Sequence, residues 1–161
     1  MIDRAVWDEL ANFESHEIVR RHMQQRRGRN PGGGLSREIA AAFTHGRSYF
    51  MSAASAGRTV RPLLLYYGVV SLARGLTMIL TRQREATLAQ AHGIGQSNWQ
   101  EILSSDKRDY GALGTVFCRG TFLDLHSATA NESLIYHAGV QEIDRVRRPA
   151  IPANFSLTLG N

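Results

Sequence analysis

The sequence predicts a mainly α-helical fold of about five helices, organised around one buried central helix at residues 61–80. Three observations support this fold class. Apolar residues recur at helical spacing through the first half of the chain. The segment 61–80 is apolar nearly all round, which is typical of a buried core helix. β-forming residues gather near residues 114–125, where a glycine separates two short runs and predicts a small β-hairpin.

Length and composition predict a single helical domain over residues 1–161. Of the 161 residues, 43% are hydrophobic and 20% are charged, which is enough apolar chain for a sizeable core. The single cysteine, Cys118, cannot form an internal disulfide, and no secretory signal pattern is visible. We therefore expect a cytoplasmic protein, and no motif in the chain predicts a cofactor.

Capping residues divide the N-terminal part into two short helices. Asp3 can cap the first of them. Ser15 can cap the second, at residues 16–27, and Gly28 then suits the left-handed position that follows a helix. The glycine-rich stretch 28–34 predicts a flexible loop.

A third helix is expected between its cap Ser36 and Gly57. Pro62 suits the first turn of the central helix, since its missing N–H would have no helical partner there. The short connection between these two helices predicts an antiparallel αα-hairpin. Gly68 and Gly75 are seven residues apart and share one face, so we expect a neighbouring helix to approach closely there.

The central helix is expected to be almost fully buried at Leu65, Val69, Leu72 and Leu76. Tyr67, Ser71 and Arg74 form a polar stripe along it, interpreted as a buried hydrogen-bonded network or, alternatively, as the wall of a site. A membrane-spanning interpretation is disfavoured because Arg74 lies in the inner half, where a charge costs about 2.5–3.5 kcal/mol.

Beyond residue 80 the sequence is polar and helix-prone up to Ala91, and glycines then interrupt it. Residues 155–159 could form a terminal strand. This C-terminal half therefore carries weaker structural signals than the N-terminal half.

The formal net charge of +5 resides in one segment. Between Ser15 and Arg37 six arginines face one carboxylate, while the charges of the rest of the chain sum to zero. Arginine pairs with phosphates bidentately, and each contact releases counterions. The candidate polyanion-binding residues are Arg20, Arg21, Arg26, Arg27 and Arg29. Two alternatives are a solvated helix face and a protein partner docked through Ile18, Val19 and Met23.

Arg119 and His126 are weak catalytic candidates. The six residues between them match the Arg-to-His spacing of metal-independent ribonucleases of the HEPN type, but the strand expected there is the wrong context for that motif. Asp124 and His126, joined by Glu132 or His137, could form a metal site, yet the polar edge of a hairpin is the simpler interpretation. No metal is therefore predicted.

Three motifs make a resemblance to a known family specific: His-Gly-Arg-Ser-Tyr-Phe at 45–50, Arg-Pro-Leu-Leu-Leu-Tyr-Tyr-Gly at 61–68, and His-Gly at 92–93. With these motifs the chain resembles the YaaC-like family of bacterial proteins, from about Trp7 to its end. The resemblance implies a helical fold and no established reaction. It also implies that the chain corresponds to the N-terminal part of a longer family fold or to a shortened member.

The leading functional hypothesis is a non-catalytic binding or scaffolding subunit of a bacterial multi-protein system. We expect it to contact other protein subunits, and nucleic acid through the basic helix, but not a membrane. The alternative is a metal-independent HEPN-type ribonuclease of a bacterial defence or toxin system.

Overall fold

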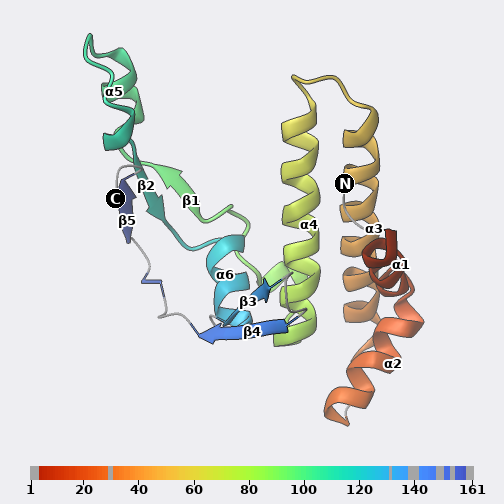
Figure 1. The fold of residues 1–161 in the computed structure, drawn as a ribbon. Coiled ribbons are helices and arrows are strands. Elements are labelled where there is room, and N and C mark those ends of the chain that lie inside the picture. The colour runs from red at the N-terminus through yellow and green to blue at the C-terminus, as the bar shows by residue number, and fades with distance from the viewer. Residues whose placement is uncertain are drawn as a thin grey trace. The chain divides into compact units, whose positions relative to one another are not determined.

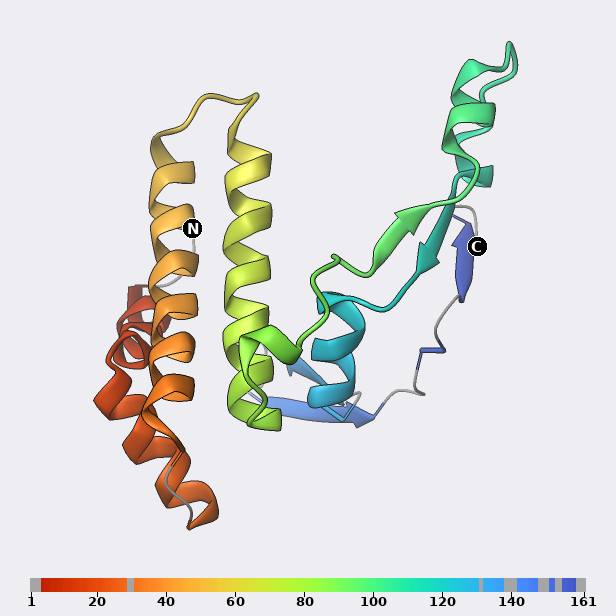
Figure 2. The same cartoon turned by 180° about the vertical axis from the view of Figure 1, so that it is seen from behind.

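The computed structural model describes residues 4–28, 31–130, 132–137, 142–147, 151–152 and 155–158. They fall into two compact units, Met1–Leu88 and Ala89–Asn161. The first unit is helical, and the second combines short helices with small sheets (Figures 1 and 2). The mainly α fold class is thus confirmed, with six α-helices in the described residues, whereas the assignment of one domain stays a prediction.

The first unit begins with two short helices, as predicted. These are α1 (Arg4–Ala11) and α2 (His16–Arg27), separated by the 3-10 turn η1 (Asn12–Glu14). The Ser15 hydroxyl accepts a hydrogen bond from the Ile18 N–H at 3.5 Å. Gly28 ends α2 with a φ of 68°, a left-handed conformation that favours glycine. Both predicted caps of α2 are confirmed, whereas Asp3, the expected cap of the first helix, lies outside the described residues.

The hairpin that follows consists of α3 (Gly33–Ser55) and α4 (Arg61–Thr81), with Pro62 in the first turn of α4. The glycine-rich stretch is a loop only in part, because α3 begins three residues before the expected cap, Ser36. Ser36 is fully buried, and its hydroxyl donates to the Gly33 carbonyl at 3.3 Å. Gly34 lies against the Arg84 guanidinium, where a Cβ would be 2.9 Å from Nη1. Packing therefore extends the helix through the glycines.

The crossing of α3 and α4 is tight, as the positions of Gly68 and Gly75 predicted. A Cβ on Gly68 would lie 2.8 Å from the Phe50 ring. On α3, Gly46 is equally close: its Cβ would lie 2.6 Å from the Leu72 side chain and 3.4 Å from the Gly68 carbonyl oxygen. The two helices therefore approach almost backbone to backbone.

The core of the first unit is centred on α3 rather than α4, contrary to the sequence prediction. Leu65, Val69 and Leu76 are 39%, 57% and 39% exposed, and Leu72 is half-buried. The cause is that η1, α1 and α2 pack over α3, and α1 lies on the side of α3 away from α4 (Figures 1 and 2). The buried cluster consists of Val19, Met23, Leu35, Ile39, Phe43, Met78 and Leu88.

By length and composition alone, α4 is apolar enough to cross a membrane, a criterion that core helices of soluble proteins also meet. Its neighbour α3 packs along it and carries Arg37, Glu38 and Arg47. A bilayer would have to accommodate these charges as well, at a cost of several kcal/mol. One helix of this kind is weak evidence for a membrane span.

The second unit contains two small antiparallel sheets and two α-helices. In the first sheet the strand order is β1-β2-β5, and in the second β3 pairs with β4. The strands are β1 (Ile94–Gln96), β2 (Gly114–Phe117), β3 (Glu132–His137), β4 (Glu142–Arg147) and β5 (Ser156–Thr158). The helices are α5 (Trp99–Ser104) and α6 (Thr121–Ala128), with a 3-10 turn at η3 (Tyr110–Ala112). The 3-10 turn η2 (Glu85–Thr87) belongs to the end of the first unit.

The predicted hairpin at 114–125 is wrong in its second half. Its first run is strand β2, but its second run belongs to helix α6. Backbone contacts from a distant segment fix the start of this helix: Thr121 N–H donates to the Ala91 carbonyl at 2.9 Å, and Phe122 N–H donates to the His92 carbonyl at 3.1 Å. The helix expected to continue up to Ala91 is instead reduced to the single turn η2.

Candidate nucleic-acid interface

Three of the five candidate arginines are exposed on α2. Arg20, Arg21 and Arg26 make no ion pair among the residues that the structure describes. Arg27 belongs to α2 but its side chain is not described, and Arg29 lies outside the described residues. The exposed cations are therefore available to an anionic ligand.

These arginines surround α2 instead of lining one face. At about 100° per residue, Arg20 and Arg21 point about 100° apart, and Arg26 points about 120° from Arg20. Val19 and Met23 are buried and mark the side of α2 that packs on the core. A polyanion can contact Arg20 and Arg21 together, whereas Arg26 lies near the buried side.

Arg26 lines a cavity of about 30 Å³ between α2 and the end of α4, together with His22, Met23, Ile79, Leu80 and Arg82. The Arg82 Nη2 donates to the Met23 carbonyl at 2.7 Å. The cations here lie at the C-terminal ends of α2 and α4, where helix dipoles favour positive charge. The cavity is large enough for about one water molecule. The two helix ends account for its arginines without a ligand.

A second basic region lies on the α3–α4 hairpin, and the sequence analysis missed it. Residues 39–84 contain no Asp or Glu and six arginines: Arg47, Arg58, Arg61, Arg74, Arg82 and Arg84. When the charges outside the segment Ser15–Arg37 are added together, acidic residues in other parts of the chain cancel the charge of these arginines. Counting by structural unit reveals it, because Met1–Leu88 contains thirteen arginines against seven carboxylates, a net charge of +6.

Several hairpin arginines hold the helices in place. Arg47 Nη2 bonds Glu14 Oε2 at 2.7 Å and so attaches α3 to η1. Arg61 donates to the carbonyls of Ala53 and Ala56, both at 3.1 Å, and so satisfies the end of α3. These two arginines are structural, although each adds positive charge.

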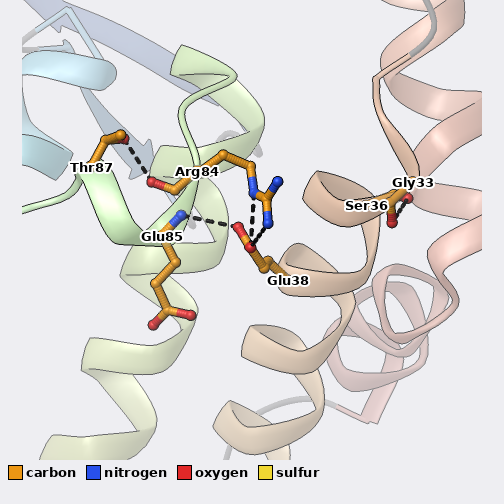
Figure 3. A network of polar contacts seen from close by, with 6 residues as sticks. All are labelled: Gly33, Ser36, Glu38, Arg84, Glu85 and Thr87. Atoms are coloured by element: carbon orange, nitrogen blue, oxygen red, sulfur yellow. Dashed lines mark hydrogen bonds and ion pairs between the residues drawn. The ribbon is translucent and has the colours of Figure 1, made fainter.

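Arg84 and Glu38 join the segment after α4 to α3 (Figure 3). The Arg84 Nε donates to Glu38 Oε1 at 2.8 Å, and the Glu85 N–H donates to Glu38 Oε2 at 3.0 Å. The hydrogen bonds from Arg84 lower the pKa of Glu38, and Glu38 in turn raises the pKa of Arg84. This ion pair fixes how the chain leaves the hairpin.

The polar stripe of α4 is open at one end. Tyr67 is 41% exposed, and its ring centroid lies 5.7 Å from that of Tyr49 and 5.4 Å from that of Tyr66. Ser71 is half-buried. The Arg74 side chain is 16% exposed, with Nη1 3.9 Å from Glu85 Oε1. The stripe therefore runs from an exposed aromatic cluster to a largely covered arginine.

Several residues of the three sequence motifs have packing roles. Besides the contacts of Gly46 and Arg47, Phe50 packs on Trp7 with ring centroids 5.2 Å apart. Gly93 has a φ of 86°, and its carbonyl accepts a hydrogen bond from Cys118 N–H at 2.9 Å. His45 is exposed and makes no contact that the described part of the chain records. The motifs are therefore structural in part, whereas His45 and, in the second motif, Leu63, Leu65, Tyr66 and Tyr67 are exposed.

The catalytic candidates Arg119 and His126 are not brought together by any described contact. Arg119 is exposed in the turn before α6, whereas His126 is half-buried on α6 beside Phe122, with ring centroids 6.1 Å apart. Asp124 has a structural role, since its Oδ2 accepts a hydrogen bond from Ala89 N–H at 3.1 Å. No group of three potential metal ligands occurs within the described residues; of the candidates, the His137 side chain is not described.

The sequence model of the YaaC-like Protein family matches residues 11–113, more than half of the chain. The match contains all three sequence motifs. It ends before residues 114–161, over which the resemblance was expected to continue. No curated protein and no solved structure matches the chain.

Proposed function

We propose that this chain, which belongs to the YaaC-like protein family, is a non-catalytic binding subunit that contacts nucleic acid through its basic first unit. We expect it to act in the bacterial cytoplasm with other protein subunits. The observation that carries the proposal is the set of exposed arginines on α2, Arg20, Arg21 and Arg26, which have no ion pair within the described part of the chain and lie in a unit of net charge +6.

The charge distribution suits the phosphate backbone more than a particular base sequence. Guanidinium groups bind phosphate oxygens in a fork geometry and release counterions. No Phe, Tyr or Trp lies between residues 15 and 37, so α2 offers no ring for base stacking. Binding through α2 should therefore be salt-dependent and weakly sequence-specific.

The structure also argues against a protein docked on the apolar side of α2. Val19 and Met23 are 0% and 2% exposed and belong to the core, so they cannot contact a partner. Of the three residues expected to serve such a partner, Ile18 alone is exposed, at 39%. A protein subunit would have to bind elsewhere on the chain.

The test is fluorescence anisotropy with labelled duplex and single-stranded oligonucleotides at 50 and 200 mM salt. The triple variant R20Q/R21Q/R26Q should lose most of the affinity, and the wild-type log K should fall by roughly 0.7–0.9 per phosphate for each unit of log salt concentration. K107Q/R108Q/R147Q is the matched control, because it removes the same charge from exposed positions of the second unit. No wild-type binding at low salt, or equal losses in both variants, would reject the proposal.

The alternative, a metal-independent ribonuclease, has one supporting observation. His126 lies on a helix, the context that the sequence analysis had expected to be missing. RNA cleavage in the presence of a chelator, abolished by H126A, would support this activity. An intact RNA substrate after incubation with the wild-type protein would reject it.

A further inference from the structure

We infer that the α3–α4 hairpin carries an aromatic platform that stacks the bases of single-stranded nucleic acid. The platform consists of Tyr49 from α3 and Tyr66 and Tyr67 from α4. The rings of Tyr49 and Tyr67 are inclined by 31°, and those of Tyr66 and Tyr67 by 64°, so the three form one contiguous cluster. This inference rests on the proposed function and names the ligand class that the first unit binds.

The platform rings are accessible and are not part of the core. Tyr66 is 37% and Tyr67 41% exposed, and Tyr49 is half-buried. None of them belongs to the buried cluster of the first unit. On α3, Phe50 follows Tyr49 by one residue and so points about 100° away, toward Trp7 of α1. The hairpin thus uses different sides for its packing on α1 and for the platform.

The hairpin that carries the platform has more arginines than carboxylates. Arg74 follows Tyr67 by seven residues, about 10 Å further along α4, where its side chain is 16% exposed and Nη1 lies 3.9 Å from Glu85 Oε1. Arg58 is exposed in the turn of the hairpin and has no ion pair among the described residues. Within α3 and α4 the one carboxylate is Glu38, near the start of α3, and it is paired with Arg84, so no unpaired carboxylate of the hairpin repels a phosphate.

This combination favours an unpaired strand over other ligands. Stacking on a side chain requires a base whose face is free, and single-strand binding proteins join such rings to a positively charged track. In a duplex both faces of each base are already occupied by neighbouring base pairs. An apolar protein surface would gain from the rings but would bring no counter-charge to the exposed Arg58.

The test compares two single strands of equal length and charge, oligouridylate and an abasic strand with the same number of phosphates, by fluorescence anisotropy at fixed salt. The wild-type protein should bind the base-containing strand about fivefold or more tightly, as expected for at least one stacked base. Y66L/Y67L should bring this ratio close to one without lowering affinity for the abasic strand. Y66F/Y67F, which keeps the rings, should preserve the ratio.

Two controls separate the platform from the other interpretations. Tyr110 is 56% exposed in the second unit, and Y110L should leave the ratio unchanged. R20Q/R21Q/R26Q should weaken both strands by the same factor, because phosphates are common to both. Helical circular dichroism of each variant serves to verify that it is folded.

The outcomes distinguish this inference from the proposed function. Equal wild-type affinity for the two strands overturns the platform and leaves phosphate binding intact. A preference for bases that survives in Y66L/Y67L also overturns it. Failure to bind either strand at low salt rejects the proposed function and the platform with it.

Discussion

Replacing Gly75 by Ala tests the close crossing of α3 and α4. The added Cβ would lie 2.8 and 3.0 Å from two carbons of the Phe43 ring and 3.3 Å from the Cβ of Ala42. Phe43 is 5% exposed, and it stacks on Phe13 with ring centroids 5.2 Å apart. The ring therefore has little room to retreat, and the backbones of the two helices must separate.

Two opposing effects set the magnitude. Alanine in place of glycine stabilises a helix interior by up to about 1 kcal/mol, whereas overpacking a filled core costs about 1–3 kcal/mol. Since a rigid buried ring is displaced, we expect the second effect to prevail. G75A should lower the free energy of unfolding by about 1 kcal/mol. At Gly57, where no atom lies within 4 Å of a new Cβ, G57A should be neutral or slightly stabilising.

The assay is urea denaturation followed by helical circular dichroism, extended to a double-mutant cycle with F43L. The smaller Leu side chain should relieve the overlap, so the double variant should be more stable than the sum of the single effects predicts. A coupling energy within about 0.5 kcal/mol of zero, or a G75A variant more stable than wild type, would refute the tight crossing.

Two further predictions concern single contacts. A Cβ on Gly120 would overlap the Gly93 backbone and lie 2.7 Å from the Ala91 carbonyl oxygen. G120A should therefore disrupt the second unit, which would be seen as a loss of near-ultraviolet circular dichroism. The control G95A should keep this signal, because the nearest atom to its added Cβ would be 3.9 Å away. Arg84 lowers the pKa of Glu38, so the ion pair stabilises the fold above the unfolded pKa of about 4.3 and is lost as pH falls through the lower folded value. Between pH 5 and pH 2 the urea midpoint of E38Q should therefore fall less than that of wild type.

Features that depend on local chemistry were predictable from the sequence. Ser15 and Gly28 bound α2 as expected because capping involves a few neighbouring residues. Gly68 and Gly75 predicted a close crossing because a missing Cβ has one direct steric consequence. The start of α6 was not predictable, since the carbonyls of Ala91 and His92, about thirty residues away, hold its first N–H groups.

Burial of α4 was mispredicted for a related reason. An apolar stripe shows that a helix can be buried, but the number of neighbours that cover it is a property of the whole packing arrangement. The earlier helices pack over α3, so α3 supplies most of the core and α4 keeps an exposed apolar surface. The basic α2 was found from local charge density, whereas the distribution of its arginines depends on which side faces the core.

The aromatic platform combines both kinds of information. Tyr49 and Tyr67 are distant in sequence and meet because the hairpin folds back on itself. The sequence alone shows that residues 39–84 contain arginines and no acidic residue. That these arginines belong to the same hairpin as a cluster of exposed rings follows only from the fold. In the motif at 45–50, Gly46, Arg47 and Phe50 are explained by packing. His45 and Tyr49, separated by one helical turn, share the stripe on which the platform lies. Within this motif, His45 and Tyr49 are therefore the residues nearest to the inferred platform.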